Sequence, residues 1–147
     1  MLPVRPPSER DRDVRFEPAE TAPPVPTTTL DEGFDRRIVT DDVGSGIQTI
    51  ALTSDHGRRR YDDRAITVSS ANSDTMSIRA DDPLSAKLVT EYRWAIASGE
   101  ADTEAMAVTE LTADETHFNL SWRIEARERG QLVHSASATR RIRRDFA

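Results

Sequence analysis

The chain contains no cysteine among its 147 residues. Disulfide bonds, thiolate nucleophiles and cysteine-ligated metal sites are therefore excluded, while the redox compartment is left open. No stretch approaches the ~20 apolar residues of a membrane-spanning helix, and residues 1–7 lack the apolar segment of a signal peptide. We therefore expect a cytoplasmic protein that does not enter a membrane.

Basic residues are in the minority, with 20 Lys and Arg against 26 Asp and Glu, so the formal net charge is −6. Sequence-independent binding of nucleic acid needs Lys and Arg to neutralise phosphates, so we expect no nucleic-acid partner. A chain of this length has room for one domain with one hydrophobic core.

Proline is almost confined to the first 33 residues, which hold seven of the eight prolines. Proline fixes φ and has no backbone donor, so this composition excludes a helix or a central strand. Residues 1–33 are predicted to form a Pro-rich extended arm. The arm is either a linker without fixed structure or a strap that docks on a partner through its apolar side chains: Val4, Val14, Phe16 and Val25.

Residues 34–147 show the two-residue alternation of strands, most clearly at 117–127. This alternation predicts an all-β domain, an antiparallel meander of about eight strands that forms a curved sheet, a sandwich or a half-open barrel. Residues 103–112 also contain good helix formers, and a helix is the alternative for this segment. The strands are expected at 34–41, 47–54, 58–61 continuing at 65–70, 75–80, 86–97, 103–112, 117–127 and 132–143.

Turns are expected between these segments where glycine, proline or short polar residues gather. Residues 54–57 and 70–74 have the composition of turns, and Pro83 is expected to stop or bulge a strand. One face should then carry the apolar side chains of the long strands, with Trp94, Trp122 and Phe118 as core candidates.

No motif for nucleophilic catalysis is present. Ser45 lies in Gly44-Ser45-Gly46, which lacks the spacing of the G-x-S-x-G nucleophile turn and falls in a predicted hairpin. The three histidines, His56, His117 and His134, show no metal-ligand spacing. His117 is expected on the polar face of its strand and His134 on the opposite face, beside Ala136.

Two groups of charged residues have structural explanations that we favour over a catalytic or binding role. Asp81 and Asp82 are adjacent in an extended chain, so their carboxylates point apart and cap a turn more readily than they share a cation. The arginines near the C-terminus, Arg140, Arg141, Arg143 and Arg144, are expected at a solvated strand edge or in salt bridges. No catalytic, cofactor-binding or metal-binding residue is assigned.

Several phrases of the sequence resemble the C-terminal β-rich region of cocaine esterase-like hydrolases, the CocE/NonD group related to X-Pro dipeptidyl-peptidases. The phrases are SIRADDPLSA (residues 77–86), LTADETHF (111–118) and RRD (143–145). The Pro-rich phrases at 2–7 and 22–26 resemble the linker that follows the jelly-roll domain of that family. None of these phrases is a catalytic signature.

The resemblance implies a non-catalytic accessory domain, whose α/β-hydrolase and jelly-roll domains would lie elsewhere in the same chain or in a partner. It implies no cofactor, no activity of the isolated chain, and a hydrolase or a homo-oligomer as partner. The alternative is a stand-alone, lipocalin-like domain that binds a small ligand. Its closed pocket would be lined by some of Leu88, Tyr92, Trp94, Phe118, Leu120 and Trp122.

Overall fold

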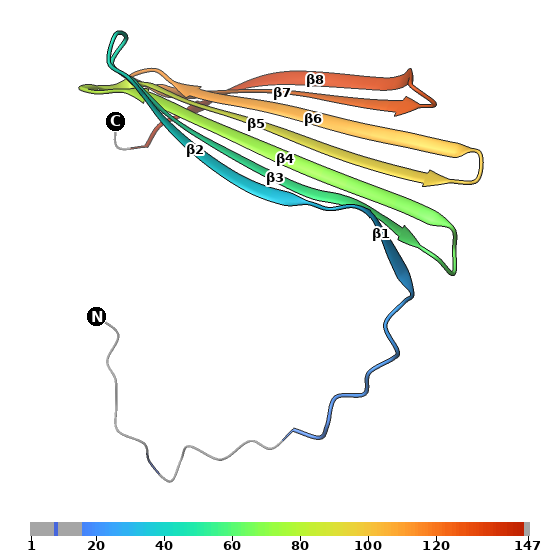
Figure 1. The fold of residues 1–147 in the computed structure, drawn as a ribbon. Coiled ribbons are helices and arrows are strands. Elements are labelled where there is room, and N and C mark those ends of the chain that lie inside the picture. The colour runs from blue at the N-terminus through green and yellow to red at the C-terminus, as the bar shows by residue number, and fades with distance from the viewer. Residues whose placement is uncertain (1–7, 9–15, 146–147) are drawn as a thin grey trace.

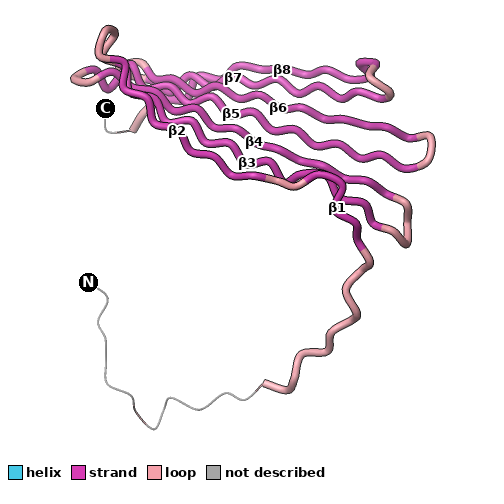
Figure 2. The backbone as a smooth tube through the Cα atoms, in the orientation of Figure 1, coloured by secondary structure: helices cyan, strands magenta, loops and turns pink. Residues whose placement is uncertain are grey.

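The computed structural model describes residue 8 and residues 16–145, and in this part of the chain all regular structure is β (Figure 1). Short turns join the long strands, as Figure 2 shows. The strands are β1 (Thr27–Asp31), β2 (Phe34–Asp42), β3 (Ile47–Tyr61), β4 (Ile66–Arg79), β5 (Asp82–Ser98), β6 (Ala101–Ala113), β7 (His117–Glu128) and β8 (Gln131–Arg143).

The strands form one antiparallel sheet in the order β1-β3-β4-β5-β6-β7-β8. Both β1 and β2 pair with β3, β2 along Ile47–Asp55 and β1 along Arg58–Tyr61, so together they make one edge of the sheet. The other edge is β8, which pairs only with β7 among the described strands. The prediction of an all-β meander is confirmed, and of its three forms the chain adopts a single curved sheet that does not close into a barrel.

Two predicted turns are wrong. Residues 54–57 lie inside β3, where the pairing with β4 shifts register between Asp55 and Arg58 as a bulge. Residues 70–74 lie inside β4 and pair continuously with Trp94 back to Thr90. In both places cross-strand pairing overrides the local turn preference of Ser, Asn, Asp and Gly.

The predicted continuation of the strand 58–61 into 65–70 is also wrong, because the chain turns at residues 62–65, so that 58–61 end β3 and Ile66 begins β4, which pairs back on it. The other segments predicted as strands lie in strands. Residues 103–112 are a strand, within β6, and not a helix. The chain turns just before Pro83, where Asp81 has a φ of 60° and the β4–β5 pairing is irregular between Ser77 and Arg79. The turn after β7 contains Gly130 with a φ of 76°, as its position in the hairpin requires.

The end of the predicted arm takes part in the sheet. β1 lies within the range 1–33, and its pairing with β3 is extended by a hydrogen bond from the Asp62 N–H to the Pro26 carbonyl, 3.0 Å. Residues 16–26 run away from the sheet (Figure 1), and Phe16 is 87% exposed. Val4 and Val14, two of the residues predicted to dock, lie outside the described residues.

Candidate functional site

The register of the strands gives the sheet two chemically different faces. Residues opposite each other in an antiparallel pair share a face, and Ile50, Met76, Leu88, Leu111 and Leu120 form one continuous row across five strands. We call this side the apolar face. It also carries Val39, Leu52, Val68, Tyr92, Trp94, Ile96, Phe118, Trp122 and Ile124.

The opposite side, the polar face, is dominated by hydroxyls and charges. Its rows include Thr49, Ser77, Lys87 and Thr112. Ion pairs lie on this face, with Lys87 Nζ 2.7 Å from Glu110 on the next strand and Arg127 Nη2 3.0 Å from Glu125 on the same strand. Exposed ion pairs of this kind contribute little to stability, so the polar face is adapted to solvent.

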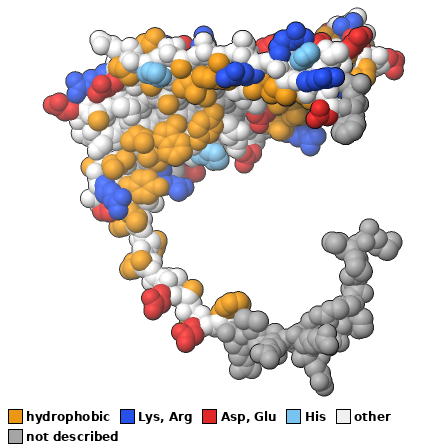
Figure 3. Space-filling model, turned by 180° about the vertical axis from the view of Figure 1, so that it is seen from behind, with side chains coloured by type: hydrophobic (Ala, Val, Ile, Leu, Met, Phe, Trp, Pro, Cys, Tyr) orange, Lys and Arg blue, Asp and Glu red, His pale blue; other side chains and the backbone are white. Residues whose placement is uncertain are grey.

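The apolar face is uncovered. Among the described residues no hydrophobic side chain is buried, because no second layer packs on the sheet. Trp94 is 44% exposed and Tyr92 42%, and their rings lie 6.5 Å apart on the same strand. Figure 3 shows hydrophobic side chains gathered in a broad area on the side of the sheet turned away in Figure 1. Contiguous exposed apolar area is uncommon on soluble monomeric proteins, so the apolar face is the candidate functional site.

One end of the apolar face is hollowed into an open pocket of about 390 Å³. Apolar side chains from β2 to β7 line it: Val39, Ile50, Met76, Ile78, Leu88, Leu111 and Phe118. The guanidinium of Arg144 lies over the Phe118 ring, 5.3 Å from its centre. The pocket is part of the apolar face and has the size and lining of a site for an apolar group.

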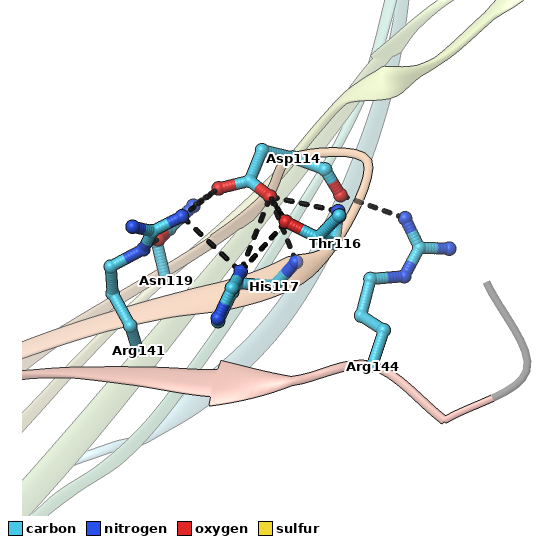
Figure 4. Close-up of polar contacts among 6 residues, drawn as sticks. All are labelled: Asp114, Thr116, His117, Asn119, Arg141 and Arg144. Atoms are coloured by element: carbon cyan, nitrogen blue, oxygen red, sulfur yellow. Dashed lines mark hydrogen bonds and ion pairs between the residues drawn. The ribbon is translucent and has the colours of Figure 1, made fainter.

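Beside this end, a carboxylate organises the turn between β6 and β7 (Figure 4). Asp114 Oδ1 accepts the backbone N–H groups of Thr116, at 2.9 Å, and His117, at 2.8 Å. Asp114 Oδ2 accepts from Arg141 Nη2 at 2.9 Å, and the Asp114 carbonyl accepts from Arg144 Nη1 at the same distance. Asp114 therefore caps the turn and also binds the end of β8.

These donors favour the ionised carboxylate. The Thr116 N–H has the largest effect and, together with the Asn119 amide, the His117 N–H and Arg141, lowers the pKa of Asp114 far below its ordinary value, although desolvation raises it. A carboxyl whose pKa is lower in the folded state stabilises the fold above its unfolded-state pKa. The stabilisation is lost as the pH falls through the folded-state pKa.

Asp114→Asn is expected to lower the urea midpoint of unfolding at pH 7, because the amide cannot accept from both backbone N–H groups and Arg141 as a carboxylate does. The difference from the wild type should shrink as the pH falls below about 4, where the unfolded carboxyl is protonated. Glu115→Gln, in the same turn and without a described partner, is the matched control. A difference that stays constant from pH 7 to pH 2 would show that the charge of Asp114 is not what stabilises the turn.

Ser45 lies in the β2–β3 hairpin, as predicted. Its hydroxyl donates to Asp42 Oδ2 at 2.6 Å, and this bond, with the Gly44 N–H on Oδ1, lowers the pKa of Asp42. The contacts of Ser45 among the described residues are those of a hairpin turn and include no histidine.

The three histidines are not brought together. His56 lies at the β3 bulge, His117 on the polar face and His134 on the apolar face beside Ala136, the last two as predicted. His117 Nδ1 lies 2.8 Å from Thr116 Oγ1 and 3.2 Å from Arg141 Nη2. No group of three or more His, Asp or Glu side chains in the described part of the chain is placed to hold a metal ion.

The other charged candidates have structural contacts. Asp82 lies 3.6 Å from Arg79 across the β4–β5 turn, and Asp81 is the turn residue with positive φ. The four arginines do not form one patch, because Arg140 pairs with Leu120 on the apolar face while Arg141 and Arg143 lie on the polar face. Sequence reasoning missed the role of Asp114, although an Asp that opens a turn before a strand is a recognisable signal.

None of the described residues forms a helix long and apolar enough to cross a membrane. No protein-family model, no curated protein and no solved structure matches the chain.

Proposed function

We propose that the chain is a non-catalytic accessory domain of a CocE/NonD-type α/β-hydrolase, and that it packs through its apolar face against the catalytic and jelly-roll domains. The hydrolase lies in the same polypeptide or in a partner chain. The family is proposed on the resemblance of residues 77–86, 111–118 and 143–145. The mode of action is proposed on the uncovered apolar face.

The single observation that carries the proposal is the sheet without a second layer. A sheet with one apolar face needs another element against that face to bury it, and domains are normally built from two or three such layers. Here the row from Ile50 to Leu120 and the rings of Tyr92 and Trp94 have no cover within the described residues. A hydrolase domain with an apolar surface supplies the missing layer.

The arm gives independent support. Residues 16–26 are exposed, extended and rich in proline, and they leave the sheet at β1 without packing on either face (Figure 1). A Pro-rich segment is extended and semi-rigid, so it can span from the sheet edge to a neighbouring domain. This is the behaviour expected of a connection to the hydrolase.

The pocket favours the alternative of a small-ligand domain. However, the sheet is open and the pocket is lined by only two of the six residues expected in a closed cavity, Leu88 and Phe118. A pocket that opens along an exposed apolar face also fits a side chain from a covering domain. We therefore keep the accessory domain as the proposal.

The test is photo-crosslinking in the source cells with p-benzoylphenylalanine at position 122 or 123. Trp122 lies on the apolar face and Arg123 on the polar face, so the two adjacent probes differ in the surface they report. We expect the probe at position 122 to join peptides of an α/β-hydrolase and the probe at 123 to join few or none. An immunoblot tells the two arrangements apart, because a band much larger than 16.4 kDa means that the hydrolase lies in the same polypeptide.

Adducts from position 122 that contain no hydrolase peptide contradict the proposal. Equal crosslinking from both positions also contradicts it, since the apolar face would then not be the docking surface. Quenching of tryptophan fluorescence by a fatty acid at micromolar concentration, without any hydrolase adduct, favours the small-ligand alternative.

A further inference from the structure

A polar belt interrupts the apolar face on four of its strands. The belt crosses β3 to β6 and consists of Ser54, Asn72, Asp74, Thr90 and Thr109. On one side lies the block that contains the pocket, around Met76 and Leu88. On the other side lies the block around Trp94 and Ile96. A surface that only excludes water has no need of such a division.

Asp74 is the charged member of the belt. It pairs with Leu52 on β3 and Thr90 on β5, and Met76 and Asn72 flank it along β4. Its carboxylate has no ion pair or side-chain hydrogen bond with any of the residues that the structure describes, and it is already half-buried. The hydroxyls of Thr90 and Thr109 are its polar neighbours across the strands.

Covering the apolar face removes Asp74 from water. An ionised carboxylate that loses its hydration without gaining a counter-charge or donors is strongly unfavourable. The belt offers three hydroxyls and an amide but no cation. The ion pairs of the polar face, such as that of Arg93 with Glu91, lie on the other side of the sheet. The compensating charge must come from elsewhere.

The nearest cation on the same face is Arg37, which occupies the same row on β2. It lies two strands away, about 10 Å at the usual strand spacing, with Leu52 between the two. Arg37 has no ion pair with Asp74, and it lies exposed at the sheet edge. In this position Arg37 remains in solvent when the centre of the face is covered.

We infer that the surface covering the apolar face presents an arginine or lysine side chain that binds Asp74 between two apolar areas. The inference rests on the proposed function and adds the chemistry of the partner surface. The two apolar blocks supply the contact area, and the carboxylate fixes the register of the partner on the sheet. Charge complementarity of this kind selects the correct partner and excludes surfaces without a cation at that point.

The test uses the hydrolase identified by crosslinking from position 122, mixed with the full chain or, for a single polypeptide, expressed in it. Asp74→Lys is expected to weaken binding by about thirtyfold or more, and Asp74→Asn to weaken it less. Glu104→Gln and Glu104→Lys on the polar face are the matched controls and should leave binding unchanged. A crosslinker at Thr90, beside Asp74, locates the basic residue of the partner. Replacing that partner residue by aspartate should restore binding to the Asp74→Lys variant.

Three results overturn the inference, and they are distinguishable. If both Asp74 variants bind like the wild type while position 122 still joins the hydrolase, the partner presents no cation to Asp74 but the proposed function stands. If Arg37→Ala weakens binding and the loss is not additive with Asp74→Asn, the cation comes from this chain. If position 122 joins no hydrolase at all, the proposed function and the inference both fail.

Discussion

Leu88→Glu is expected to reduce the binding of the dye ANS and the self-association of the isolated chain severalfold. Leu88 lies at the centre of the exposed apolar row, opposite Met76 on β4 and Leu111 on β6, and it lines the pocket. Exposed apolar area drives both dye binding and aggregation, and a carboxylate in the middle of it divides the area. Dye fluorescence and sedimentation velocity measure the two effects.

Val89→Glu is the matched control for this prediction. Val89 is the next residue of β5, is also apolar and half-buried, and lies on the polar face opposite Thr75 and Glu110. It should change dye binding and self-association little. If both variants reduce dye binding equally, the dye does not bind specifically to the apolar face, and the claim that this face is the binding surface is contradicted.

The same substitution has a second consequence when the hydrolase is present. Full burial of a leucine side chain contributes about 1.5–3 kcal/mol, and here the new carboxylate would also be desolvated. Leu88→Glu should therefore abolish crosslinking from position 122, while Val89→Glu should preserve it. Loss of self-association together with loss of docking would show that one surface is responsible for both.

The two faces of the sheet could be predicted from the sequence because strand alternation is a local property. The alternation at 86–97 and 117–127 places Leu88, Trp94, Leu120 and Trp122 on one face, and the register confirms that they share it. The expectation that these aromatic side chains form a core is wrong for the described residues, since a core needs a second layer. Alternation shows which side chains share a face but not what covers them.

The continuity of β3 and β4 could not be predicted, because it depends on partners distant in sequence. Residues 70–74 look like a turn by composition, but each is held between a residue of β3 or its bulge and a residue of β5. The Asp114 cluster is non-local for the same reason, since Arg141 and Arg144 reach the carboxylate and carbonyl from 27 and 30 residues away. Local propensity identifies the turn at Asp114 but not the distant strand, β8, that this turn binds.

Two glycines lie where the pairing partner of β3 changes from β2 to β1. At this point a Cβ on Gly57 would lie 2.2 Å from the Asp31 carbonyl oxygen and 2.7 Å from the Gly33 nitrogen. A Cβ on Gly33 would lie 2.2 Å from the Asp55 carbonyl oxygen. Gly57 also has a φ of 69°, and its N–H donates to Asp55 Oδ1 at 2.7 Å. The close approach of the two backbones leaves no room for a side chain at either position.

Gly57→Ala is therefore expected to destabilise the sheet more than the same change at any other glycine of this chain. Gly99→Ala is the matched control, because Gly99 has a φ of 56° and nothing within 4 Å of the added Cβ. The control measures the cost of a left-handed backbone alone, about 1–2 kcal/mol. The backbone clash at Gly57 should add about 1–3 kcal/mol and release β1. Urea unfolding measures the total and hydrogen exchange of residues 27–31 measures the release, and equal losses for the two variants would contradict the close packing of β1 against the β3 bulge.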